Sequence, residues 1–201
     1  MIYEWSNTSL KYAQYGGMTE EDEGAITWYS PVLGTPLPPL SEWKIPTLTQ
    51  YIGNGDKKSS RMIADCVSSA SVHLISQKAV DLLKDIWDKH ATLYPVILDD
   101  KPDEYYYMVV VHTVIDCLDR ANSIGSKYNE ETEKGKKGYF NSITEWFMRE
   151  EEIGDNDLFV LPDSPTAIYV TEKFKQRIIE ANLTGFGFCK TKYFDDEPFI
   201  S

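Results

Sequence analysis

The chain has 201 residues, of which 42% are hydrophobic and 13% aromatic, and this composition is typical of a folded protein and not of a disordered acidic tail. Its 32 acidic and 20 basic residues give a net charge of −12 at pH 7. This charge argues against a binder of DNA, RNA or anionic membranes, because those partners demand basic surfaces, and it favours a basic protein as partner.

The start of the chain and its cysteines indicate the compartment. Residues 1–6 lack the cationic and apolar regions of a secretory signal, and no apolar run reaches the ~18 residues of a membrane span. Cys66, Cys117 and Cys189 are far apart and form no C-x-x-C pair, so we expect small buried side chains and no disulfide framework. We expect a cytoplasmic protein without a cofactor or metal.

The first sixty residues are rich in turn formers. The stretch Pro31–Pro39 contains four prolines, which lack the donor needed in ladders and helix interiors. The best strand in this segment is Ala25 to Tyr29. We predict a single domain over residues 1–201, in which residues 1–60 form an irregular cover on an α+β core of residues 61–201.

From about residue 62 strand-like and helix-like segments alternate. Val72–Ile75 is a predicted strand and Ser76 a predicted N-cap. Residues 93–98 form the next strand, and residues 105–115 form a long strand that is apolar on both alternating faces, as expected of a central strand covered on both sides. Between Ser76 and residue 93 we predict one amphipathic helix, because apolar residues recur at helical spacing at Ala79, Leu82, Leu83, Ile86 and Trp87.

The C-terminal part repeats this order of elements. Ile168–Val170 is a predicted strand, Thr171 a cap, and Leu183–Cys189 a closing strand. An offset of 95 residues superimposes Ser76 on Thr171 and the two helices on each other, a match that fits either a duplication or the shared period alone. The fold class is α+β: a mixed, mostly antiparallel sheet with a few packed helices and two related strand–helix–strand units. The predicted face of the second helix consists of Phe174, Ile178 and Ala181.

The segment D-C-L-D-R-A-N at Asp116–Asn122 resembles the core of the Sac-type phosphoinositide phosphatases. In that family the nucleophilic cysteine lies six positions before the arginine, where this chain has Val114. Cys117 lies only three residues before Arg120, too close for a phosphate-cradling loop. A phosphoinositide or nucleotide phosphatase is therefore the enzymatic alternative, and it lacks its nucleophile.

The three histidines, His73, His90 and His112, are the candidate general bases or metal ligands. Their spacings to the cysteines match no common zinc pattern, and we interpret them as hydrogen-bonded structural residues. We predict no catalytic residues.

Three acidic clusters are the remaining signal, and none has the alternating order of a calcium loop. Together with the net charge they predict a surface that meets a basic partner, with Trp146, Phe147 and Met148 as possible apolar anchors beside the second cluster. The clusters are Asp99, Asp100, Asp103 and Glu104; Glu150, Glu151, Glu152, Asp155 and Asp157; and Asp195, Asp196 and Glu197.

Five short strings resemble a bacterial immunity-protein family of polymorphic toxin systems. They are HLISQK at 73–78, DCLDRANS at 116–123, LFVL at 158–161, IYVTEK at 168–173 and LTGFGF at 183–188. The family pattern places Ser76 and Thr171 at helix entries, Asp119 and Ser123 in its central motif and Gly185 in its closing motif. The resemblance implies that these five residues are structural.

The resemblance also implies a function, namely an inhibitor that binds and neutralises a cognate toxin. A basic nuclease-type toxin suits the acid excess, because nuclease surfaces are basic. An interaction module with another, non-toxin partner is the second alternative. The sequence sets no oligomeric state.

Overall fold

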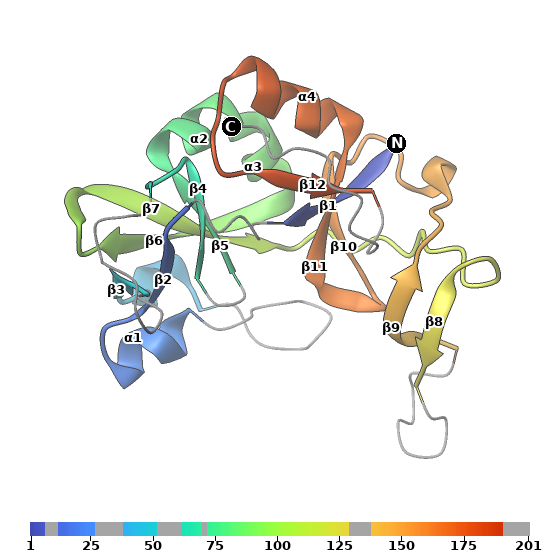
Figure 1. The fold of residues 1–201 in the computed structure, drawn as a ribbon, viewed down its shortest axis with the longest axis horizontal. Helices are drawn as coiled ribbons and strands as arrows, with labels where there is room; N and C mark the ends of the chain where they lie inside the picture. The colour runs from blue at the N-terminus through green and yellow to red at the C-terminus, as the bar shows by residue number, and fades with distance from the viewer. Residues whose placement is uncertain (7–11, 27–37, 52–61, 70–71, 129–137, 191–201) are drawn as a thin grey trace.

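The computed structural model of the chain (Figure 1) describes six stretches of residues. These are residues 1–6, 12–26, 38–51, 62–69, 72–128 and 138–190. Within them the strands form a closed barrel, a four-stranded sheet and a two-stranded sheet, and most strand pairs are antiparallel. With helices added, this is the predicted α+β class. No helix of the described stretches is long and apolar enough to cross a membrane.

The barrel has six strands, of which β2 pairs with β4 and β3 with β6 in parallel and the others pair antiparallel. Its longest strand, β7, is covered on both faces only over residues 106–111, where Met108 and Val110 point into the barrel core and Val109 and Val111 pack under the helices; residues 102–105 are exposed. In order around the barrel the strands are β2 (Gln14–Gly17), β3 (Thr47–Gln50), β6 (Ala91–Leu98), β7 (Lys101–Val111), β5 (Val72–Ser76) and β4 (Cys66–Ser69).

The predicted long strand 105–115 ends earlier than expected. After Val111 the chain leaves the ladder, and Val114 makes only an isolated bridge with Val160. It starts earlier as well, at Lys101, because β6 and β7 form a tight hairpin that pairs Leu98 with Lys101.

The four-stranded sheet has the order β10 (Leu158–Leu161), β11 (Ser164–Thr171), β1 (Ile2–Ser6) and β12 (Gly187–Cys189). β1 is therefore an inner strand and not part of an irregular cover. Its alternate side chains fill two cores, with Tyr3 and Trp5 on one face and Ile2 on the other. The non-local pairing of the first residues with residues 168–171 and 187–189 has no local sequence signal.

The predicted strand Ala25–Tyr29 is wrong at its start, and Thr27–Tyr29 lie outside the described residues. Ala25 ends helix α1 (Glu20–Ala25), and Ile26 is its C-cap. Thr19 and Asp22 form a reciprocal capping box, and the acidic first turn suits the helix N-terminus. A short 3₁₀ turn, η1 (Leu40–Glu42), precedes β3.

The predicted helix after Ser76 is present as two shorter helices, α2 (Gln77–Leu82) and α3 (Lys84–His90). The break lies at Leu83, whose carbonyl accepts from both Ile86 N and Trp87 N. The change of direction turns Leu82 outward, so this one member of the predicted apolar face is 46% exposed. Ala79, Leu83, Ile86 and Trp87 are buried as predicted.

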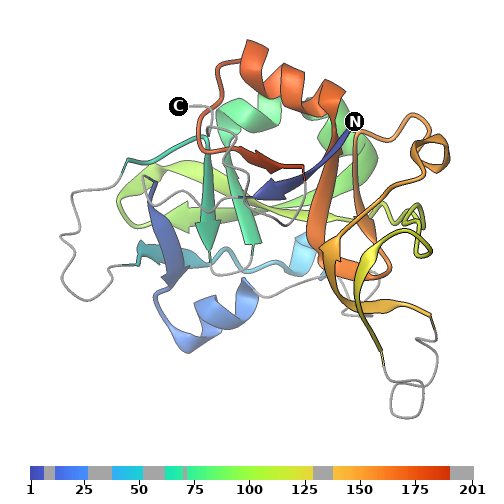
Figure 2. The same ribbon diagram turned by 45° about the vertical axis from the view of Figure 1, so that its right-hand side comes forward.

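The helix of the second unit, α4 (Glu172–Glu180), buries Phe174 and Ile178 and packs beside α2 and α3 (Figure 2). Residues from the barrel, from the four-stranded sheet and from α2, α3 and α4 belong to one hydrophobic cluster. The closing strand is shorter than the predicted Leu183–Cys189. It is limited to Gly187–Cys189 because Gly185 has φ +84°, which extended backbone does not adopt.

Both predicted caps are confirmed, and each has an aspartate partner. Ser76 Oγ accepts from Ala79 N and donates to Asp65 Oδ1 at 3.1 Å. Thr171 Oγ1 accepts from Phe174 N and donates to Asp157 Oδ1 at 2.8 Å. The ammonium groups two positions after each cap contact the same aspartates, with Lys78 at 3.5 Å and Lys173 at 2.7 Å. The two related units therefore share side-chain chemistry as well as element order.

We predict that Gly185→Ala destabilises the fold by more than about 3 kcal/mol. A Cβ at this position would lie 2.0 Å from the Cys66 carbonyl oxygen, so backbone would have to move in addition to the strain of a positive φ. Gly138→Ala is the matched control, because Gly138 has φ +82° and an added Cβ there meets nothing within 4 Å. The free energy of unfolding, measured with urea, should fall by only about 1–2 kcal/mol in the control. Equal losses in both variants would contradict the close approach.

Candidate partner-binding surface

The two acidic clusters that the structure describes lie at opposite ends of the molecule (Figures 1 and 2). The first is at the turn between β6 and β7, at the outer end of the barrel. The second follows β9 (Phe140–Glu145) in the 3₁₀ turn η2 (Glu150–Glu152) and the loop to β10. The two clusters therefore do not make one surface. Asp195, Asp196 and Glu197, the third cluster, lie outside the described residues.

Two of the four acids of the first cluster, Asp99 and Asp100, are engaged within the barrel end. Asp99 Oδ2 accepts from Thr49 Oγ1 at 2.8 Å, and both Asp100 oxygens accept from the buried Tyr15 hydroxyl at 3.1 Å. Burial, and then the adjacent Asp100 charge, raise the pKa of Tyr15 far above its usual value. Of the other two acids, Glu104 contacts Lys101 at 3.2 Å and Asp103 is exposed.

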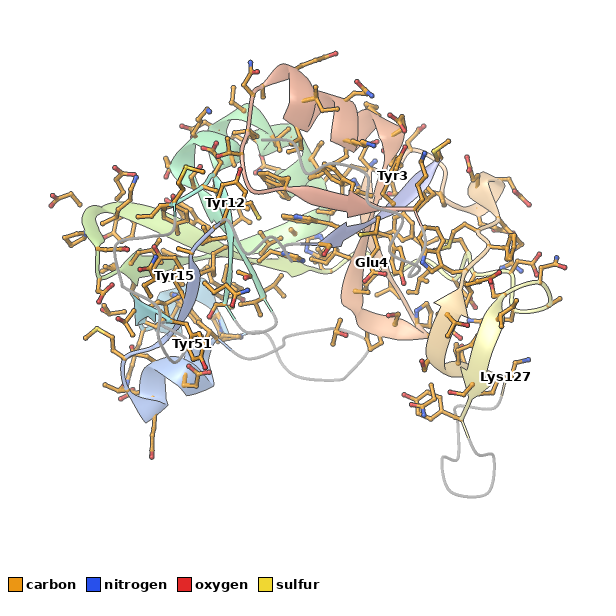
Figure 3. All side chains as sticks on the ribbon, viewed as in Figure 1. Tyr3, Glu4, Tyr12, Tyr15, Tyr51 and Lys127 are labelled. Carbon is orange, nitrogen blue, oxygen red and sulfur yellow. The ribbon has the colours of Figure 1, made fainter. Side chains whose placement is uncertain are left out.

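A groove of about 680 Å³ opens beside this cluster, lined by Tyr15, Gly16, Thr49 and Tyr51 among others. Tyr15 and Tyr51 lie at the same end of the barrel (Figure 3), and Tyr51 is 63% exposed. Several polar groups that line the groove have partners within the protein: Tyr51 N donates to Gln14 O at 2.6 Å, and Gly17 N donates to Glu23 Oε2 at 2.6 Å.

The second cluster divides into exposed and structural acids. Glu150, Glu151, Glu152 and Asp155 are exposed, and Glu150 Oε2 lies 3.2 Å from the N-terminal ammonium. Asp157 is only 9% exposed and bonds to the cap of α4, as described above. Asp157 thus holds the fold and is poorly placed to contact a partner, whereas Glu150–Glu152 are open to one.

Of the three predicted apolar anchors, only Phe147 is exposed. Trp146 is 8% exposed and its ring packs edge-on against Tyr169 at 5.6 Å. Met148 is half-buried and its sulfur accepts from Cys117 at 3.7 Å. Phe147 is 50% exposed and lies in the chain segment that leads to the exposed glutamates.

The central family motif residues build a turn beneath Phe147. Asp119 Oδ1 accepts from Ala121 N and Asn122 N, the pattern of an Asx turn. Ser123 Oγ accepts from Phe147 N at 3.0 Å, and Asp119 N donates to Phe147 O at 2.8 Å. These bonds agree with the structural role that the resemblance implies for Asp119 and Ser123.

Arg120 is fully engaged in ion pairs. Its guanidinium donates to both oxygens of the buried Asp163 at 3.1 and 2.7 Å and to Asp116 at 2.6 Å, and it lies 4.5 Å from the centre of the Tyr139 ring. Asp163 Oδ1 also accepts from Phe140 N at 2.8 Å. Sequence reasoning missed Asp163, because it lies 43 residues from Arg120 in a Pro-Asp-Ser-Pro turn that has no functional signature.

This geometry gives no support to the phosphatase alternative. Cys117 is buried, and burial raises the pKa of its thiol to about 11, so the thiol stays protonated at neutral pH. Arg120 faces two carboxylates, which repel a phosphate.

His90 is buried and His73 is partly buried, whereas His112 is exposed and its amide donates to the His90 carbonyl oxygen at 3.0 Å. His73 stacks on Trp5 with ring centroids 4.3 Å apart, His90 Nδ1 lies 3.0 Å from Thr113 Oγ1, and His112 Nε2 lies 3.2 Å from the Lys89 carbonyl oxygen. Among the described residues no group of three or more His, Cys, Asp or Glu side chains is arranged to hold a metal ion. Cys66 and Cys117 are buried as expected, and Cys189 is half-buried.

A family model described as "Immunity protein family (Imm11)" matches residues 28–193. No curated protein matches the chain.

We predict that Arg120→Ala lowers the free energy of unfolding by about 3–5 kcal/mol, because it leaves the fully buried Asp163 carboxylate without its ion partner. Lys84→Ala is the control: it removes an ion pair exposed at both ends and should cost less than about 1 kcal/mol. Urea unfolding of both variants decides the matter. A loss in Arg120→Ala no larger than in Lys84→Ala would show that the Arg120–Asp163 pair does not hold the fold.

We predict that the fold loses about 2 kcal/mol between pH 7 and pH 5 through His73. Burial lowers the pKa of His73 to about 4, below the ~6.5 of an unfolded histidine. As the pH falls through this window, His73 becomes protonated in the unfolded chain but stays neutral in the folded chain, so the free energy of unfolding falls. His73→Phe, which keeps a ring against Trp5, should remove that part of the pH dependence, and His112→Gln should not. Unfolding curves at the two pH values test this, and identical pH slopes in wild type and His73→Phe would contradict it.

Proposed function

The chain belongs to the Imm11 immunity protein family, because the family model covers residues 28–193, well over half of its length; we propose that it is a non-enzymatic inhibitor that binds a cognate bacterial toxin and neutralises it. The single observation that carries this proposal is the family match. The absence of a reactive thiol and of a free arginine in the Asp116–Asn122 segment agrees with it.

We further propose that the toxin is a basic protein of the nuclease type. A net charge of −12 repels other acidic proteins and attracts a surface rich in lysine and arginine. A nuclease needs such a surface for the phosphates of its substrate. An acidic inhibitor that occupies this surface blocks substrate binding without touching the catalytic groups, and we place the encounter in the cytoplasm, where nucleic acid is reached.

The exposed glutamates at 150–152 follow the exposed aromatic side chain of Phe147 by three to five residues. Because their carboxylates are solvated, they contribute mainly to the rate of association and little to the free energy of the bound state. The acids at the barrel end act through the overall field in the same way. Both ends are candidates for contact, and they are far enough apart to be tested separately.

The first experiment is recovery of the partner. The chain, purified from its native host at moderate salt, should carry a toxin whose growth arrest is relieved by co-expression of this chain. Repeated recovery of a non-toxin partner, with no protection against any toxin of the host, would favour the interaction-module alternative and overturn the proposal.

We predict that the triple variant Glu150→Lys, Glu151→Lys and Glu152→Lys binds the recovered toxin with an association rate at least about 10-fold lower at low salt, and with a weaker dependence on salt. The reason is the loss of steering at the end of the molecule that carries Phe147. Stopped-flow kinetics at several salt concentrations measure both quantities.

The matched control carries the same change of net charge at the barrel end, in Glu20→Lys, Asp103→Lys and Glu104→Lys, all exposed. If the control slows association more than the first variant, the partner docks at the barrel end. Unchanged kinetics in both variants would contradict a basic partner.

A further inference from the structure

The two-stranded sheet of β8 (Ile124–Lys127) and β9 projects from the rest of the molecule (Figures 1 and 2). We call these two strands the β8–β9 arm. All four residues of β8 are exposed, and Lys127 lies toward the outer end of the arm, far from the barrel (Figure 3). Among the described residues β8 pairs with β9 alone, so its outer edge is open.

The β9 strand of the arm is held against the rest of the fold, including at Phe140, the residue that pairs with Lys127. Phe140 and Ile143 of β9 are buried in the hydrophobic cluster on the Ile2 face of the four-stranded sheet, and the Phe140 amide donates to Asp163, the partner of Arg120. The two strands approach closely at Gly125, where an added Cβ would lie 2.1 Å from the Ser142 carbonyl oxygen. An arm whose inner strand is held this firmly loses little conformational entropy when a partner binds.

Two large apolar side chains lie exposed at the inner end of the arm. Ile124 is 53% exposed and Phe147 is 50% exposed. They are neighbours, because Ile124 pairs with Glu145 across the arm and the Phe147 amide donates to the hydroxyl of Ser123, the residue before Ile124. Exposed apolar side chains that lie together inside a polar rim mark protein interaction sites.

The charges around this apolar pair are mainly acidic. Asp116, Asp119 and Glu145 flank it, and the exposed Glu150–Glu152 follow a few residues after Phe147. The cations nearby are engaged: Arg120 bonds to two carboxylates, and Arg149 donates to the Asp116 carbonyl oxygen at 2.8 Å. An apolar centre inside an acidic rim suits a partner with an apolar spot inside a basic surface.

We propose that Ile124 and Phe147 on the β8–β9 arm form the centre of the surface that docks onto a basic protein, the toxin of the proposed function, on which this inference rests. The apolar pair supplies the contact that lowers the dissociation rate, and the acidic rim supplies attraction and orientation. The occupant is a folded basic protein and not a second copy of this chain, because two copies would bring two acidic rims together.

The test uses the whole chain and the recovered toxin, inactivated at its catalytic site, as the probe. The double variant Ile124→Ser and Phe147→Ser should raise the dissociation constant at least about 100-fold, mostly through faster dissociation. The matched control, Leu82→Ser and Ile179→Ser, removes two apolar side chains that are 46% and 37% exposed on α2 and α4 and should change it less than about 3-fold. Thermal unfolding of both variants confirms that they fold.

A photo-crosslinking amino acid at position 147, and in a second variant at position 82, gives an independent measurement. The crosslink to the toxin should form from position 147 and not from position 82. A double variant that binds like wild type, or a crosslink from position 147 to another copy of this chain, overturns the docking surface while wild-type binding upholds the proposed function. A wild-type chain that binds no toxin overturns the proposed function itself.

Discussion

The fold depends on an aspartate that fixes the point where a strand becomes a helix, and the chain uses this interaction twice. Asp65 accepts from the Ser76 hydroxyl and from both the amide and the hydroxyl of Thr184, so it joins the N-terminus of α2 to the loop after α4. Asp157 accepts from the Thr171 hydroxyl and from Lys173 at the start of α4. Because α2 and α4 cover one shared core, these bonds set the position of the helices over both the barrel and the four-stranded sheet.

The sequence predicted the hydroxyl caps of this interaction and not the aspartates that bind them. Ser76 and Thr171 are recognisable as caps because a hydroxyl before a helical apolar pattern is a local signal. The aspartates are 11 and 14 residues earlier, so the offset of 95 residues that relates the caps does not relate their partners. The same limit applies to β1, whose partners are at residues 168–171 and 187–189, and to the break at Leu83, where a helical pattern continues through a change of direction. Hydrophobic spacing predicts which residues are buried, but pairing across the chain depends on packing that no short window contains.

Acidic residues in this chain have two different roles, stabilising the fold and charging the surface, and the sequence alone does not separate them. Asp65, Asp157 and Asp163 stabilise the fold, and each accepts hydrogen bonds from other side chains of the protein. Glu150, Glu151 and Glu152 are exposed and carry the charge toward solvent. A cluster read from the sequence mixed both kinds, because adjacency along the chain says nothing about burial. The net charge therefore overstates the number of acids that a partner meets, although its long-range field still includes them all.

The Asp116–Asn122 segment has a structural role, which follows from the distinction between acids that stabilise the fold and acids that face solvent. Its arginine binds Asp163, Asp163 holds the Phe140 amide, and Phe140 is the first residue of β9, so the segment anchors the β8–β9 arm to the four-stranded sheet. Its Asp119 and the following Ser123 fix the backbone on both sides of Phe147. A string that resembles a phosphatase core thus stabilises an arm that exposes Ile124 and Phe147 to solvent. Because an ion pair with one fully buried member resists local opening, the arm keeps its shape before any partner arrives, and binding energy is not consumed in ordering it.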